Sequence, residues 1–145
     1  MQNFNRSEYA QLKNFLSFYV QRYMPMAFLP PEKQPLAALE AMEKTSPRMA
    51  FQGLRQAISD CVERSWPFDP AEVANLDAEL TDRGIITLSE LRRRYSRGYA
   101  KILKRGRIKN DTEFHLLRNI INDPTEKSPG ERELLAKLIS DYEGA

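Results

Sequence analysis

Hydrophobic residues recur every three or four positions along most of the chain, which is the spacing of an amphipathic α-helix. The pattern predicts a first helix over about residues 6–24 and a short second helix at 36–42, after a proline-rich link. The clearest hydrophobic stripe runs from Ala50 to Val62, and we predict that it forms the central helix of the core. Alternating patterns typical of β-strands are essentially missing from the sequence.

Four further helices are predicted in the second half of the chain. Their hydrophobic stripes cover residues 73–80, 88–102, 114–121 and 134–142. Gly84 and Gly106 follow the first two of these stripes, where glycine favours the left-handed end of a helix. The 114–121 stripe carries apolar residues on two sides, which indicates a helix that is enclosed by others.

Capping signals support the helical interpretation. A side chain that can cap a helix N-terminus stands before a proline or three residues before a glutamate at six places. These are Asn5–Glu8, Ser46–Pro47, Asp69–Glu72, Thr87–Glu90, Asn110–Glu113 and Ser128–Glu131. The sequence therefore predicts an all-α fold, with residues 1–145 forming a single compact domain of six or seven helices.

Composition excludes several classes of protein. With 145 residues, 41% hydrophobic and 29% charged, the chain has enough apolar material for one core and is unlike a disordered or disulfide-scaffold sequence. Residues 1–8 lack the layout of a signal peptide, and no apolar run approaches the 18 or so residues that span a bilayer. We therefore expect no membrane association and a cytoplasmic location.

The residues that usually carry catalysis are scarce. There is one cysteine, Cys61, and one histidine, His115, so no paired-histidine or thiolate metal motif exists, and the glycines form no phosphate-binding loop. We expect Cys61 to be a small core residue and His115 to be a partly buried structural one. Trp66 and Phe68 are expected to cover the core between two helices. The sequence predicts a protein that is not an enzyme and that needs no cofactor or metal.

The charge distribution is the one strong anomaly. The segment Arg92–Lys109, here called the basic segment, holds nine basic and no acidic residues, while the rest of the chain carries 13 basic and 20 acidic residues. On one continuous helix the stripe from Arg93 to Arg105 would be about 18 Å long. The candidate residues for binding a partner or phosphates are Arg93, Arg94, Arg97, Lys101, Lys104, Arg105 and Arg107.

Like charges at this spacing repel, so an anion is expected to offset them. The anion could lie within the chain, on the acidic residues of neighbouring predicted helices: Asp77, Glu79, Asp82, Glu131, Glu133 and Asp141. It could also belong to a nucleic acid, since residues 76–105 are similar in spacing to a helix–turn–helix. Against base reading, Leu88 and Glu90 occupy the leading turn of the second helix.

The third source of an anion is a protein partner. A strongly bipolar charge layout steers the encounter of two proteins and rejects wrong partners. The sequence thus favours a non-enzymatic protein–protein interaction module, such as an immunity- or inhibitor-type protein that binds and blocks a partner. The alternative is a nucleic-acid-binding protein that uses the basic segment on phosphates.

Overall fold

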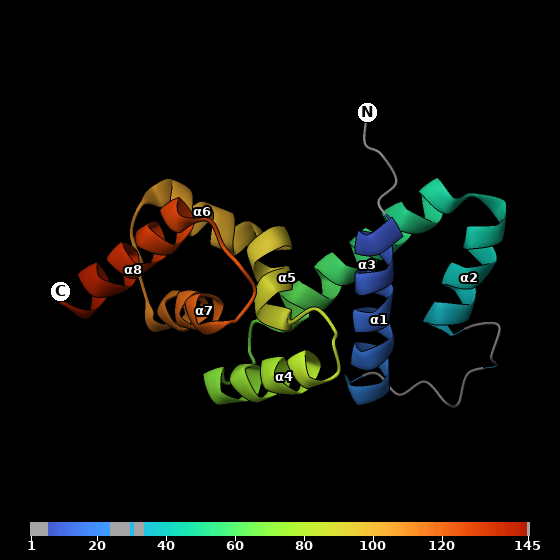
Figure 1. Ribbon diagram of the computed structural model, residues 1–145, viewed down its shortest axis with the longest axis horizontal. Coiled ribbons are helices and arrows are strands. Elements are labelled where there is room, and N and C mark those ends of the chain that lie inside the picture. The colour runs from blue at the N-terminus through green and yellow to red at the C-terminus, as the bar shows by residue number, and fades with distance from the viewer. Residues whose placement is uncertain (1–5, 24–29, 31–33, 145) are drawn as a thin grey trace. The chain divides into compact units, whose positions relative to one another are not determined.

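The computed structural model describes residues 6–23, 30 and 34–144, and these residues form eight α-helices and no strand (Figure 1). The helices are α1 (Arg6–Tyr23), α2 (Pro35–Thr45), α3 (Pro47–Arg64), α4 (Pro70–Asp82), α5 (Leu88–Tyr95), α6 (Arg97–Arg105), α7 (Asp111–Asn122) and α8 (Pro129–Glu143). The all-α prediction is confirmed, whereas the predicted number of six or seven helices is too low.

The difference arises at Ser96, which divides the helix predicted after Thr87 into α5 and α6. Ser96 has extended backbone angles (φ −79°, ψ 122°), and its hydroxyl accepts a hydrogen bond from the backbone N–H of Tyr99 at 3.2 Å. Its own N–H still donates to the carbonyl of Arg92, so one residue ends α5 and begins α6. The prediction of one continuous basic stripe is therefore wrong.

The predicted helix ends are otherwise found in the structure. Five of the six expected N-terminal caps accept a backbone N–H of the following turn, and the sixth, at Asn5, lies outside the described residues. The five are Ser46, Asp69, Thr87, Asn110 and Ser128. Gly84 and Gly106 have φ values of 71° and 80°, the left-handed conformation that glycine adopts without strain.

Contacts divide the chain into two compact units, residues 1–64 and residues 65–145. A single domain that spans the whole chain stays a prediction. In the first unit, α3 contacts both α1 and α2, and its buried residues include Leu54, Ile58 and Cys61. The predicted central helix of the core is therefore the element against which both other helices of this unit pack.

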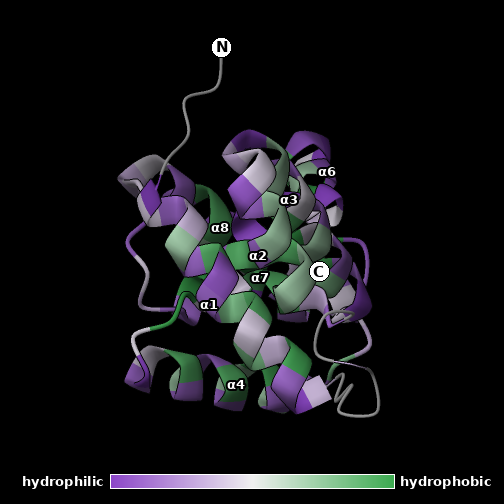
Figure 2. Cartoon of the chain, turned by 90° about the vertical axis from the view of Figure 1, so that its right-hand side faces the viewer, coloured by the Kyte–Doolittle hydropathy of each residue, from purple (hydrophilic) through white to green (hydrophobic). Residues whose placement is uncertain are grey.

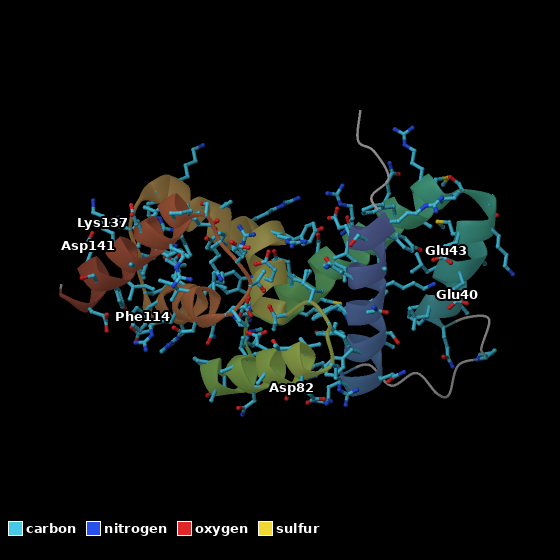
Figure 3. All side chains as sticks on the ribbon, in the orientation of Figure 1. Glu40, Glu43, Asp82, Phe114, Lys137 and Asp141 are labelled. Atoms are coloured by element: carbon cyan, nitrogen blue, oxygen red, sulfur yellow. The ribbon has the colours of Figure 1, made fainter. Side chains whose placement is uncertain are left out.

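Helix α2 is also tied to α1 by polar contacts. Glu43, labelled with Glu40 on α2 in Figure 3, accepts a hydrogen bond from the hydroxyl of Tyr9. The same carboxylate forms an ion pair with Lys13 at 3.1 Å. Tyr9 and Lys13 stand four residues apart on α1, so both reach one partner on α2.

In the second unit, α7 contacts α4, α5, α6 and α8, as its two apolar sides predicted. The core around it consists of Tyr99, Ile102, Ile108, Leu116, Leu117, Ile120, Leu135, Leu138 and Ile139. Phe114, labelled on α7 in Figure 3, lies beside Tyr142 of α8 with ring centres 5.3 Å apart. Helix α4 shows hydrophobic and hydrophilic residues in alternating bands in Figure 2, as expected for an amphipathic helix.

A buried polar contact joins α4 to α5. The carboxylate of Asp77 accepts the backbone N–H of Ser89 at 3.1 Å and its hydroxyl at 2.5 Å. Both residues are buried, so this contact fixes the first turn of α5 against α4. The beginning of the basic segment, which follows on the same short helix, is thereby held in place.

No helix in the described part of the chain has the length and apolar character needed to cross a membrane.

Candidate functional site

The structure divides the nine cations of the basic segment into three groups. Arg92 is buried. Three cations form ion pairs with carboxylates of the same unit: Arg93, Arg94 and Arg105. The other five are exposed and form no ion pair with any described residue: Arg97, Lys101, Lys104, Arg107 and Lys109.

The first paired group surrounds Glu90, whose residue is only 1% exposed. Arg93 reaches both oxygens of this carboxylate, at 2.9 and 2.8 Å, and the Nε of Arg94 donates to it at 2.7 Å. Burial acts to raise the pKa of Glu90, but the hydrogen bonds and charges of the two arginines outweigh it and hold the pKa below its usual range. Glu90 is therefore ionised and neutralises part of the basic segment from within.

Arg93 also extends this network to α8. Its Nη1 donates to Glu131 at 2.9 Å, and the other oxygen of Glu131 accepts the hydroxyl of Tyr99 at 2.6 Å. Of the acidic residues expected to pair with the basic segment, Glu131 does so. Asp77 binds Ser89 instead, and Glu79 forms its ion pair with Arg83 on its own helix.

The second paired site closes the loop between α6 and α7. Arg105 donates to both oxygens of Glu113, at 2.7 and 3.0 Å, and to the carbonyl of Arg107 at 3.0 Å. The backbone N–H of Lys109 reaches the same carboxylate at 2.9 Å. The hydrogen bond from Arg105 is the main cause that lowers the pKa of Glu113. Arg105 therefore holds this loop in place, and nothing in the sequence pattern distinguishes it from the cations beside it.

The exposed cations gather on one side of α6. Arg97, Lys101 and Lys104 are spaced by four and three residues, which places them along one face, here called the α6 basic face. The opposite side of the helix buries Tyr99 and Ile102. At 1.5 Å per residue the face is about 10 Å long, and Arg107 and Lys109 follow it in the next loop.

The structure removes the support for a helix–turn–helix that reads bases. Such a module uses the first residues of its second helix to contact base edges. Here that turn, formed by Leu88, Ser89 and Glu90, is buried. It packs on the unit's own core and carries the contact to Asp77, so its side chains cannot enter a groove.

No protein-family model, no curated protein and no solved structure matches the chain.

The two residues that sequence patterns left as candidates for catalysis differ in the structure. Cys61 is buried, as predicted, and burial raises the pKa of its thiol to about 12. The prediction of a partly buried His115 is wrong, because its residue is exposed and lines a cleft on α7. Within residues 6–23, 30 and 34–144, no three His, Cys, Asp or Glu side chains come together as a metal site.

Proposed function

We propose that the protein is a non-enzymatic protein–protein interaction module whose α6 basic face binds an acidic surface of its partner. One observation carries the proposal: these three cations are exposed and form no ion pair with any described residue, on a unit that pairs Arg93, Arg94 and Arg105 internally. Inhibitor-type and immunity-type proteins belong to this class, because they act by occupying a partner's surface and need no catalytic group.

The repulsion within the face favours an external anion. Arg97 and Lys101, and Lys101 and Lys104, are like-charge neighbours on one helix, and each such pair costs about 0.2–0.5 kcal/mol. Carboxylates of a partner would remove this cost and add charge-assisted hydrogen bonds. Because the face is exposed, its charges also act at long range and accelerate the encounter with an acidic partner.

Charge balance favours a protein over a nucleic acid as that partner. Residues 65–145 carry 14 basic and 14 acidic residues, so the unit has no net positive charge to attract a long polyanion. A duplex carries one charge per about 1.7 Å and extends far beyond a face about 10 Å long. Tyr99, the aromatic residue of α6, is buried and offers no surface on which a base could stack.

The test compares two variants with the same change in charge. In the face variant, Arg97, Lys101 and Lys104 are each replaced by glutamate; in the control, the exposed Arg6, Lys44 and Arg48 of the first unit are replaced in the same way. Each tagged protein is used to capture partners from nuclease-treated host extract, which mass spectrometry identifies. We expect the wild type and the control to retain one acidic protein. The face variant should retain less of it, because it associates with that protein more slowly.

Anisotropy with a labelled duplex and a labelled single strand tests the alternative. We expect no measurable binding of the wild type near 0.15 M salt. Sub-micromolar binding that the face variant loses would overturn the proposal in favour of nucleic-acid binding. In that case each lost phosphate contact should also reduce the slope of log affinity against log salt by about 0.9 for duplex.

A further inference from the structure

A cleft of about 230 Å³ opens in the second unit, between the segment 65–70 and helices α5 and α7. This volume is many times the 10–15 Å³ or so that one water molecule needs by the same measure. Its apolar lining is formed by Trp66, Pro67, Phe68, Pro70 and Leu116. Its polar lining is formed by Asp69, Arg92, Thr112, His115 and Asn119. Polar and apolar groups that line one cleft can together bind a small ligand that carries both kinds of group.

The guanidinium of Arg92 is a positively charged group of this cleft. The residue is only 4% exposed, and it uses one edge of its side chain on Ser65: Nε donates to the hydroxyl at 3.1 Å and Nη2 to the carbonyl at 2.7 Å. Its Nη1 forms no hydrogen bond with any described residue. Because guanidinium has a second edge, formed by Nη1 and Nη2, the side chain can still bind one planar anion.

No carboxylate in the described part of the unit neutralises this arginine by an ion pair. The acidic group that acts on it is Asp77, whose oxygens are engaged by Ser89. Burial lowers the pKa of Arg92 to about 10, which leaves the side chain protonated at neutral pH. The cleft therefore holds a buried positive charge whose stabilisation is incomplete, and a bound anion would complete it.

We propose that this cleft binds a carboxylate carried on a small apolar group, with the carboxylate on the Nη1/Nη2 edge of Arg92 and the apolar group against Trp66 and Leu116. A carboxylate matches the planar fork of guanidinium. Asp69 also lines the cleft, and its negative charge disfavours a dianion such as phosphate more than it disfavours a monoanion. The shared chemistry covers two sources, a free organic acid and the C-terminal carboxylate of a peptide.

The apolar wall is held in place by the fold. The indole of Trp66 packs against Gly98 at the start of α6, and the guanidinium carbon of Arg92 lies 6.0 Å from the centre of its ring. A wall that is fixed before the ligand arrives costs little entropy on binding. None of the three residues of the α6 basic face lines the cleft. Ligand binding in the cleft therefore goes beyond the proposed function, and each of the two proposals can be tested without the other.

Trp66 provides the readout, because it is the only tryptophan of the chain and gives a single indole N–H signal in NMR spectra. The full-length protein is titrated with benzoate and with the neutral, nearly isosteric benzamide. A short peptide that ends in phenylalanine, with a free or an amidated C-terminus, distinguishes the second source. We expect both carboxylates to shift the Trp66 signal with saturation, and the amides to bind at least about tenfold more weakly.

Two matched variants test whether the carboxylate binds inside the cleft. Asn119→Asp adds a negative charge inside the cleft, while Asn75→Asp makes the same change at an exposed position of α4 that does not line it. We expect Asn119→Asp to weaken benzoate binding by about tenfold or more and Asn75→Asp by less than about twofold. Arg92→Gln should abolish the difference between benzoate and benzamide, provided that circular dichroism shows it folded.

Three results would overturn the proposal. One is the absence of a Trp66 response to either carboxylate up to about 10 mM, roughly the weakest binding that one group of this kind gives. Another is equal affinity for benzoate and benzamide. The third is equal weakening by the two asparagine variants, which would place the anion outside the cleft.

Discussion

Trp66 and Gly98 are in such close contact that a Cβ atom on Gly98 would lie 2.6 Å from Cζ2 and 2.9 Å from Cη2 of the indole. The glycine stands in the first turn of α6, where its φ is ordinary, so the requirement is for space and not for an unusual backbone conformation. The tryptophan, which packs on the core of the second unit, therefore determines how α6 can begin.

The first prediction follows from this contact. Gly98→Ala should reduce the free energy of unfolding by about 1–3 kcal/mol, because a rigid ring has to move to admit the methyl group. Gly53→Ala is the matched control: Gly53 is in the interior of α3 with nothing within 4 Å of its added Cβ, so alanine should stabilise by about 0.5–1 kcal/mol. Denaturant titrations give both values, and a stabilised Gly98→Ala variant would contradict the packing.

The second prediction concerns the buried carboxylate of Glu90. Glu90→Gln keeps the shape of the side chain but removes the charge that Arg93 and Arg94 share. We expect the free energy of unfolding to fall by about 2 kcal/mol. This is less than breaking a buried ion pair usually costs, because both arginines are partly exposed. Glu79→Gln, which breaks the exposed pair with Arg83, should cost less than about 1 kcal/mol. Equal costs measured by chemical denaturation would show that Glu90 is not a buried partner.

The sequence was sufficient for most helix boundaries, because local chemistry decides them. A capping side chain or a left-handed glycine acts within four residues, and those at Asp69, Asn110 and Gly106 act as their spacing predicts. The sequence pattern does not predict a break at Ser96, because no glutamate follows it at the capping-box position. The signal that could have found it is the Ser96–Gly98 pair, since serine and glycine are weak helix formers that often mark a break.

The basic segment could be predicted as a charge run but not as a surface. Glu90 stands three and four residues before Arg93 and Arg94, so their pairing was visible as helical spacing. The pairing of Arg105 with Glu113 depends instead on the turn between α6 and α7, and that of Arg93 with Glu131 on tertiary packing. Only the three-dimensional structure therefore separates the five exposed cations without an ion pair to a described residue from Arg92, Arg93, Arg94 and Arg105.

The third prediction tests the core of the first unit. Cys61 is 4% exposed, and its raised pKa leaves almost no thiolate near neutral pH. We expect native protein to react slowly with a thiol reagent and to react fast once guanidinium unfolds it. Leu54→Ala, on the same buried face of α3, should lower the free energy of unfolding by about 2–5 kcal/mol and accelerate the labelling of Cys61. Fast labelling of the native wild type would place this face in solvent.

The last prediction concerns the pH dependence that Asp77 gives to stability. Burial is the main cause that raises its pKa to about 6 from an ordinary value of 3.8, and the hydrogen bonds from Ser89 oppose this only in part. The folded protein therefore holds the proton more tightly than the unfolded chain does. The resulting stabilisation is fully present below the unfolded pKa and is lost as the pH rises through about 6.

Asp77→Asn isolates this contribution. Asparagine can accept the backbone N–H of Ser89 and donate to its hydroxyl, but it carries no charge at any pH. From about pH 4 to about pH 7, the wild type should lose up to about 3 kcal/mol of unfolding free energy relative to this variant. Asp82→Asn makes the same substitution at an exposed position of the same helix and is the matched control. The comparison with variants is needed because Glu90 changes the pH dependence of stability in the opposite direction. Its lowered pKa stabilises the fold above the ordinary value of 4.5, and this stabilisation is lost on acidification. Parallel curves for the wild type and Asp77→Asn would mean that the contact between α4 and α5 carries no buried charge.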